Sequence, residues 1–355
     1  MQRFFQRLWK WYGNHARNLP WRDTSNPYQI WVSEVILQQT RVAQGIDYYH
    51  NFIFTFPDIA SLAHAPEEKI LKIWQGLGYY SRARNMQAAA RLMMDKYGGN
   101  FPVRYSEIAE LPGVGPYTAA AIASFAFGLP YPAVDGNVKR VVARLFALHE
   151  PVQSAAFMQQ ALALLQELMP GKRAADFNQA MIELGATLCS PRNPACDQCP
   201  VAEMCEAHRT GTTDRFPVTR PKKAAVKRYH DYLFLESKGE TWLQKRPEMG
   251  IWAGLYEFPV HILEYDAGLS PLEIFGNWFY NPGEAVVADR TEFTHLLTHQ
   301  TIFARFWHLC SDRTNIVEQK NCTRIAMEEI ETLPVHRLMH KYLEKKDWRD
   351  STEKQ

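Results

Sequence analysis

Four closely spaced cysteines constrain this chain more than any other feature of its sequence. They follow the pattern C-x6-C-x2-C-x5-C, at Cys189, Cys196, Cys199 and Cys205. A [4Fe-4S] cluster needs four thiolates, and one short loop can supply them all. A four-thiolate zinc site is the first alternative, although such sites usually take ligands from two close pairs and only the middle two cysteines form one. Disulfides fit poorly, because Cys310 and Cys322 lie far away, and the sequence assigns these two no role.

Length and composition are those of an ordinary soluble protein. The chain has 355 residues, of which 46% are hydrophobic and 22% charged, so we expect about two domains. No apolar run approaches the roughly 18 residues of a membrane helix, and the mixed basic and aromatic start from Met1 to Lys10 does not resemble a secretory signal. We therefore expect a cytoplasmic protein with no membrane partner. The net charge of +2 neither favours nor excludes nucleic acid.

The sequence pattern changes once along the chain. Residues 1–207 repeat apolar positions at intervals of three and four, which predicts an all-α domain. Residues 208–228 are polar and basic and predict a linker. Residues 229–346 contain short aromatic and β-branched runs and predict an α+β domain, followed by a tail at 347–355. Strands are expected at 229–235, 241–245, 255–260 and 301–309, and helices at 271–280 and 334–345.

The segment Leu111-Pro112-Gly113-Val114-Gly115 predicts a tight turn. Gly113 and Gly115 let the backbone bend and leave N–H groups uncovered, and Pro116 suits the first position of the helix that follows. Backbone N–H groups at a helix start bind anions, and a nucleic-acid phosphate is the natural ligand. For a Gly-x-Gly pair alone, an ordinary turn between two helices is the structural alternative.

A carboxyl group lies within a strongly apolar helical segment. The pattern predicts one buried helix from Asn26 to Val42, with Glu34 near its centre and Gln38, Gln39 and Thr40 on its last turn. Burial would raise the pKa of Glu34 and make it a proton donor near neutral pH. The alternative is that Glu34 occupies a narrow solvent-facing stripe.

Asp135 is the second candidate carboxyl group. It precedes a predicted helix, so a helix cap is its simplest role. A helix start stabilises the ionised form, and we expect Asp135 to stay charged while Glu34 is protonated. Two carboxyl groups whose pKa values are pushed apart are typical of enzymes that break glycosidic bonds.

Five elements occur in an order that resembles a known family. They are Glu34 with Gln38-Gln39-Thr40, then Gly76-Leu77-Gly78-Tyr79-Tyr80, the glycine turn at 111–115, Val134-Asp135-Gly136-Asn137, and the four cysteines. Together they resemble the helix-hairpin-helix DNA glycosylases of the endonuclease III superfamily. The resemblance implies a two-lobed helical domain that binds DNA across its cleft, a turn from Gly113 to Gly115 that grips a phosphate, and a [4Fe-4S] cluster on the loop at 189–205.

Tyr117 separates two branches of that superfamily. Members that also cut the DNA strand carry a lysine there, whose amine forms a Schiff base with the sugar. A phenol cannot, so the resemblance implies a glycosylase that uses water and stops at the abasic site. The string from Trp31 to Thr40 further resembles the adenine DNA glycosylases, which remove adenine mispaired with 8-oxoguanine; we expect guanine mispairs to serve as well. An endonuclease III-like activity on oxidised pyrimidines is the alternative, and Tyr117 and the second domain argue against it.

The same resemblance implies roles for single residues. Glu34 would protonate N7 of adenine, and Asp135 would stabilise the oxocarbenium-like sugar. The residues expected to contact the flipped adenine, the site that it vacates or the adjoining DNA are Trp21, Arg22, Gln38, Gln39, Thr40 and Gln179. Tyr79 would wedge into the duplex beside 8-oxoguanine.

The second domain resembles the Nudix-like domain of adenine DNA glycosylases. The string from Trp252 to Pro259 matches the glycine-rich strand entry, but residues 261–272 lack the arginine and paired glutamates of Nudix hydrolases. We therefore expect recognition without hydrolysis. Phe293-Thr294-His295 matches a Phe-Ser-His loop that relatives place over 8-oxoguanine. The expected partner is double-stranded DNA that carries the mispair, bound by a monomer.

Overall fold

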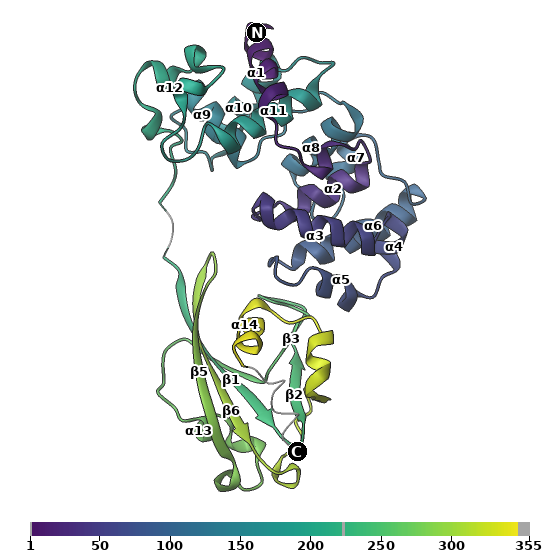
Figure 1. The fold of residues 1–355 in the computed structure, drawn as a ribbon, viewed down its shortest axis with the longest axis vertical. Coiled ribbons are helices and arrows are strands. Elements are labelled where there is room, and N and C mark those ends of the chain that lie inside the picture. Colours follow the sequence, from purple (N-terminus) through teal and green to yellow (C-terminus); the bar gives the residue numbers. More distant parts are fainter. Residues whose placement is uncertain (1, 222–223, 347–355) are drawn as a thin grey trace. The chain divides into compact units, whose positions relative to one another are not determined.

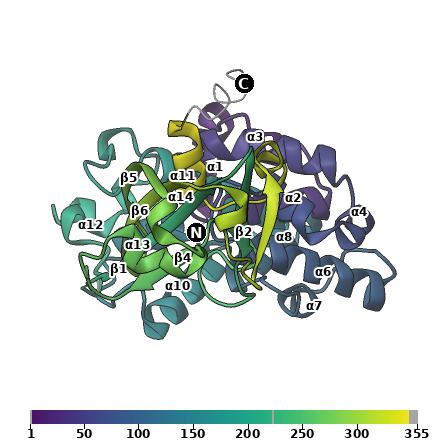
Figure 2. The same ribbon diagram turned by 90° about the horizontal axis from the view of Figure 1, so that it is seen from below.

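The computed structural model describes residues 2–221 and 224–346, which form two compact units (Figures 1 and 2). The first unit comprises residues up to His64 together with Asn85–Pro221. The second comprises Ala65–Arg84 and the chain from Lys222 onward. The boundary after Pro221 falls inside the predicted linker. The sequence did not predict that residues 65–84 would belong with the second unit.

The first unit is all-α, as predicted. Its helices are α1 (Gln2–His15), η1 (Pro20–Arg22), α2 (Pro27–Ile36), α3 (Val42–Thr55), α4 (Ile59–His64), α6 (Ser81–Tyr97, which begins in the second unit), α7 (Tyr105–Ala109), α8 (Pro116–Phe127), α9 (Gly136–Leu145), α10 (Ala155–Leu168), α11 (Ala174–Thr187) and α12 (Glu206–Arg209), with 3-10 turns η2 (Cys196–Gln198), η3 (Ala202–Met204) and η4 (Thr213–Arg215). One lobe holds α1 and α9 to α12, and the other holds α2 to α4 and α6 to α8 (Figure 1). Buried residues such as Leu8, Val142, Phe157 and Phe177 form the core of the first lobe.

The predicted helix from Asn26 to Val42 is interrupted. The Asn26 side chain caps α2 by accepting from the Tyr28 N–H at 2.9 Å, but α2 ends at Ile36 and a turn follows. Gln39 has a positive φ of 64°, which a non-glycine residue rarely adopts. Gln38 donates to the Thr118 hydroxyl on α8 at 3.3 Å. The prediction that Gln38, Gln39 and Thr40 continue the helix was therefore wrong. Hydrophobic periodicity could not have shown this, because the contact involves a helix distant in the sequence.

The second unit is α+β, as predicted. Its strands are β1 (Val226–Glu236), β2 (Glu240–Lys245), β3 (Tyr256–Glu257), β4 (Val260–Leu263), β5 (Val286–Leu296), β6 (Gln300–Cys310) and β7 (Cys322–Ala326), and its α-helices are α5 (Glu67–Ile73), α13 (Pro271–Phe275) and α14 (Arg337–Lys345). The sheet orders are β4-β1-β6-β5 and β3-β2-β7, and β1 runs parallel to β6. The strand expected at 255–260 divides into β3 and β4, because Pro259 has no N–H to donate to a ladder.

The central strands of the larger sheet are covered on both faces. Tyr232 and Phe234 of β1 pack with Phe306 and with Tyr342 of α14, which lies against the sheet (Figures 1 and 2). Alternate residues of the same strands, such as Leu233, Leu235 and Leu309, enter a second cluster. Since both faces are buried, β1 and β6 are held firmly in register.

Only part of the predicted linker lacks regular structure. α12 extends to Arg209, η4 spans Thr213–Arg215, and β1 begins at Val226. Phe216 is buried in the core of the first unit, so the chain up to this point packs with the helices. Lys222, Lys223 and the tail at 347–355 lie outside the described residues. Within the described ranges, no helix is long and apolar enough to cross a membrane.

Candidate active site

A cavity of about 580 Å³ lies within the first unit. It is lined from η1, α2, the turn after α2, the start of α8, the start of α9, and α11. The sequence-predicted residues that line it are Trp21, Arg22, Glu34, Gln38, Gln39, Thr40, Tyr117, Asp135 and Gln179. A cavity of this size is within the range of small-molecule binding pockets and is large enough to admit a single base. Residues predicted from separate motifs therefore lie around one space.

Glu34 is buried on α2, with 7% of its surface exposed. Its neighbour Ser33 is buried as well, so the two do not form a solvent-facing stripe. Burial raises the pKa of Glu34 to about 7, the hydrogen bond with Tyr117 lowers it, and the nearby charge of Asp135 raises it. A large fraction of Glu34 is thus protonated at neutral pH, and the predicted proton donor has a physical basis.

Asp135 is both a helix cap and a cavity residue. Its Oδ1 accepts from the Val138 N–H at 2.7 Å, and its Oδ2 accepts from the Asn137 side-chain amide at 2.8 Å. Burial raises the pKa of Asp135, and these hydrogen bonds oppose the rise. The sequence predicted that the helix start would dominate, but here the desolvation cost of the buried carboxylate outweighs it.

Tyr117 lies in the first turn of α8 and lines the same cavity. Its hydroxyl hydrogen-bonds the Glu34 carboxyl. Burial, followed by the charges of Glu34 and Asp135, raises the pKa of the Tyr117 phenol well above its ordinary value, so the hydroxyl stays neutral. A neutral phenol can orient a carboxyl group, but it supplies no amine for an imine.

The three predicted pocket residues are each held by a partner. Arg22 donates to Glu183 at 2.6 Å, and Gln179 accepts from the Tyr12 hydroxyl at 2.7 Å. The ring of Trp21 packs edge-on against Tyr49, with centroids 5.4 Å apart. These contacts fix the side chains around the cavity.

Glu183 is a residue that the sequence analysis missed. Its side chain is fully buried and accepts hydrogen bonds from Arg17 at 2.7 and 2.9 Å and from Arg22 at 2.6 Å. Burial alone would raise the pKa of Glu183, but the hydrogen bonds and charges of the two arginines outweigh it and lower the pKa. A glutamate on an amphipathic helix is typical of a surface position, so no local signal distinguishes Glu183.

The predicted glycine turn is present before α8. Gly113 has φ of +77°, and a Cβ atom there would lie 2.6 Å from Cβ of Asn85, so only glycine fits. Gly115 is the N-cap residue of α8, where no side chain caps the helix. Both glycines are exposed, and the phosphate contact implied for them stays a prediction.

The four cysteines converge on one hollow in the first unit. Cys189, Cys196, Cys199 and Cys205 all line it, together with Arg144 of α9. Arg144 donates to Sγ of Cys189 at 3.3 Å and to the Ser190 carbonyl at 2.7 Å, and so anchors the loop to a core helix.

The spacing of these sulfurs is wider than a single zinc ion would hold them. Four thiolates on one zinc ion would lie within about 4 Å of one another. In the part of the chain that the structure describes, no three of these cysteine sulfurs all lie within 4.8 Å of one another. A [4Fe-4S] cluster binds each thiolate to a different iron and accepts the wider spacing. These four residues would hold the cluster, which stabilises the loop.

Comparison with known proteins agrees with this geometry. Residues 32–167 match the family described as "HhH-GPD superfamily base excision DNA repair protein", residues 189–205 the "Iron-sulfur binding domain of endonuclease III", and residues 232–345 the "NUDIX domain". An adenine DNA glycosylase of Buchnera aphidicola subsp. Baizongia pistaciae is 34% identical over 90% of each chain.

The chain belongs to the adenine DNA glycosylase family.

Further relatives fit this family. The human adenine DNA glycosylase is 37% identical over 71% of this chain and 56% of its own length. Among solved structures, a thermostable thymine-DNA glycosylase has a TM-score of 0.53 and 28% identity, covering 58% of this chain and 95% of its own. A non-covalent endonuclease III–DNA complex has a TM-score of 0.52 and 25% identity, covering 59% and 95%. The [4Fe-4S] cluster predicted for this glycosylase family member is thereby confirmed.

The wedge predicted for this glycosylase family member lies in the second unit. The loop before α6 carries Gly76, Gly78 and Tyr79, with φ of +100°, +72° and +48°. Tyr79 is 48% exposed, and its hydroxyl lies 2.5 Å from Oγ1 of Thr298. A strained, exposed tyrosine at a predicted contact is typical of a functional site, and its role as a wedge stays a prediction.

Phe293, Thr294 and His295 do not form a loop, so that expectation was wrong. They lie in β5 and pair with β6, and the Phe293 ring packs against core residue Phe306. The turn between the two strands spans residues 297–299 and contains Thr298, the contact of Tyr79. A Thr-His pair occurs both at 294–295 and at 298–299. The motif alone could not choose between them, because the choice depends on where β5 ends.

Proposed function

We propose that this protein removes adenine from double-stranded DNA by hydrolysis, where the adenine is mispaired with 8-oxoguanine or guanine, and leaves an abasic site. The observation that carries the proposal is Glu34, buried at a cavity of about 580 Å³ with its pKa raised to about 7, in the same cavity as Asp135. Tyr117 stands where a strand-cutting relative would need lysine. Membership of the adenine DNA glycosylase family supports the choice of adenine.

The proposed chemistry uses the cavity residues in turn. Adenine leaves the stack and enters the cavity, as enzymes that act on bases require. Glu34 donates its proton to N7, so the base departs neutral, while the Asp135 carboxylate faces the positive charge that develops on the sugar. Water then adds to the sugar carbon that the base has left, and its proton passes to a carboxylate of the cavity. The hydroxyl of Tyr117 orients Glu34, and Gln179 and Arg22 contact the adenine edge.

The proposed reading of the opposite base lies in the second unit. Tyr79 wedges beside 8-oxoguanine. The family resemblance implies that Thr294 contacts that base, but the contact between Tyr79 and Thr298 favours the turn at 297–299 as the element that lies beside it. Gly113 and Gly115 bind a backbone phosphate. The protein acts as a monomer on the nucleoid, and its cluster takes no part in the hydrolysis.

The proposal is tested with a Glu34→Gln variant and defined duplexes. The variant keeps the shape of the side chain but has no acidic proton, so we expect excision of adenine opposite 8-oxoguanine to fall by about 10²–10⁴-fold, while duplex binding measured by fluorescence anisotropy persists. Rapid adenine release by the variant would remove Glu34 from its role. A parallel duplex with thymine glycol opposite adenine tests the alternative, and release of that pyrimidine alone by the native protein would overturn the assignment.

A further inference from the structure

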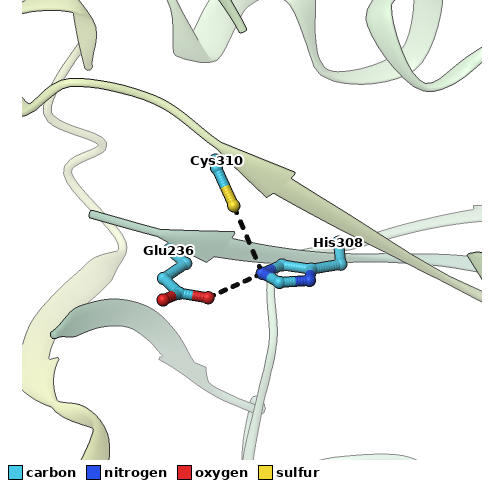
Figure 3. Close-up of side chains that lie close together, drawn as sticks. All are labelled: Glu236, His308 and Cys310. Atoms are coloured by element: carbon cyan, nitrogen blue, oxygen red, sulfur yellow. Dashed lines mark hydrogen bonds and ion pairs between the residues drawn. The ribbon is translucent and has the colours of Figure 1, made fainter. Parts of the chain in front are cut away.

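We propose that Glu236, His308 and Cys310 form a zinc-binding site in the second unit, separate from the four-cysteine loop. In the described part of the chain, they are the one group of three or more His, Cys, Asp or Glu residues whose donor atoms all lie within 4.8 Å of one another (Figure 3). None of them lines the cavity of the first unit. The inference does not depend on the proposed glycosylase activity.

Strand pairing brings the three residues together. β1 and β6 are parallel neighbours, and Glu236 is directly opposite Cys310 in their register. His308 is two residues before Cys310 on β6, so both side chains leave the same face of the sheet. The site therefore rests on the rigid ends of two central strands, rather than on a loop.

The contacts of His308 distinguish a metal site from a catalytic triad. Its Nε2 atom lies 2.8 Å from Oε2 of Glu236 and 3.5 Å from Sγ of Cys310 (Figure 3). In a Cys-His-acid triad the thiol and the carboxylate use the two different ring nitrogens. Here both approach the same nitrogen, which carries at most one hydrogen. Three donor atoms that lie within 4.8 Å of one another are close enough for a single metal ion to bind them all.

The donor types select the ion. A thiolate, an imidazole and a carboxylate are the ligands that zinc accepts in proteins, whereas magnesium and calcium prefer oxygen alone. Three protein ligands leave the fourth tetrahedral position for water. The side chains of His308 and Glu236 are 10% and 29% exposed, so the site is enclosed by protein but open to an ion from solvent.

The surroundings orient the imidazole. The ring of Phe234 stacks on His308 with centroids 4.6 Å apart, and the Lys346 ammonium contacts Nδ1. When zinc binds, Cys310 releases its thiol proton to solvent and the ring hydrogen of His308 resides on Nδ1. Lys346 must then turn away, and the carboxylate of Asp289, 3.9 Å from Nζ, can receive it.

The test measures zinc and iron together in the full-length protein with its cluster assembled. The protein is equilibrated with zinc chloride, desalted and analysed by mass spectrometry of the metals. We expect one zinc per chain in the native protein and a loss to background in Cys310→Ser, with iron unchanged in both. Cys322→Ser is the matched control, because Cys322 also lies outside the cluster loop but packs against the core cluster on the other face of the sheet; it should retain zinc. Equal zinc in the native protein and Cys310→Ser would overturn the proposal.

Cobalt provides an independent readout on the same proteins. A difference spectrum against the cobalt-free sample should show thiolate-to-cobalt charge-transfer absorption in the native protein and in Cys322→Ser, but not in Cys310→Ser. Should Cys310→Ser fail to fold, His308→Gln replaces it, because the amide is close in size and keeps Cys310 in place. A native protein without the charge-transfer absorption, or a His308→Gln variant that keeps it, would contradict the site.

Discussion

Glu34 and Glu183 are two buried carboxyl groups in the first unit whose pKa values move in opposite directions. Both have lost most of their contact with water, which by itself disfavours the charged form. Glu183 is surrounded by Arg17 and Arg22, and these hold it ionised. The hydrogen-bond partner of Glu34 is instead a neutral phenol, the nearby carboxyl of Asp135 raises its pKa, and the charge of Arg22 lowers it with a smaller effect.

The contrast shows that burial does not decide the charge of a carboxyl group by itself. The identity of the partners decides it, and with it the role of the side chain. A carboxylate paired with two arginines holds the wall of the cavity in place. A carboxyl group beside a phenol and a second acid keeps its proton and is able to donate it.

Of the two carboxyl groups, Glu183 is the ionised one, and its removal should have the largest effect on the stability of the protein. Glu183→Gln leaves two arginines without their counter-ion, of which the Arg22 side chain is only 12% exposed. Loss of one member of a buried pair usually costs 3–5 kcal/mol, and we expect about 3 kcal/mol here because Arg17 is partly exposed. Urea unfolding followed by circular dichroism measures the change.

A matched control separates this effect from the loss of a charge. Glu203 also pairs with an arginine, Arg7 at 2.8 Å, but its side chain is 67% exposed. Glu203→Gln should cost less than about 1 kcal/mol. Equal losses in the two variants would mean that the buried network contributes nothing beyond a surface ion pair.

Removal of the Glu34 carboxyl group, which keeps its proton, should stabilise the protein, but only at high pH. The folded-state pKa of Glu34 is raised from 4.5 to about 7, so the native protein loses stability as the pH rises between these values. The full loss is at most about 3 kcal/mol at 1.36 kcal/mol per unit. Glu34→Gln avoids it, and we expect a gain of about 2 kcal/mol at pH 8 and almost none at pH 4.5. A gain that is the same at both pH values would show that ionisation of Glu34 is not its cause.

Replacement of Tyr117 should have a smaller effect, because it shifts the pKa of Glu34 and leaves the carboxyl group in place. The hydrogen bond from Tyr117 lowers the pKa of Glu34, so Tyr117→Phe should raise that pKa by less than about one unit. The pH at which excision falls to half should move upward from about 7 by the same amount. Single-turnover rates between pH 5 and pH 9 measure this shift. A downward shift would assign Tyr117 the opposite effect on the carboxyl group.

Local sequence signals nominated the candidate residues but did not predict their environment. An acid within an apolar helix marked Glu34, a cap position marked Asp135, and residues on separate elements were assigned to one site by their resemblance to a family. Two element boundaries differed from the prediction: α2 ends at Ile36, and the strand expected at 255–260 is interrupted at Pro259. The loop expected at Phe293 proved to be strand, because pairing with β6 continues to Leu296.

Glu183 and the Glu236–His308–Cys310 group had no signal in the sequence at all. Glu183 lies on α11, more than 160 positions from its arginines, and Glu236 is 72 positions from His308. Each residue alone is ordinary. Only strand register and helix packing bring such groups within a few ångströms of one another.

The sequence by itself determined the chemistry that this protein carries: four thiolates for a cluster, two carboxyl groups, a tyrosine where an amine would change the reaction, and a glycine turn. These are properties of residue type and spacing, which local covalent geometry preserves. The tertiary structure alone decided which carboxyl group keeps its proton, which side chains line the cavity and which donors converge at the end of the sheet. Those outcomes depend on desolvation and on partners distant in the chain, and the two act only after the elements have packed.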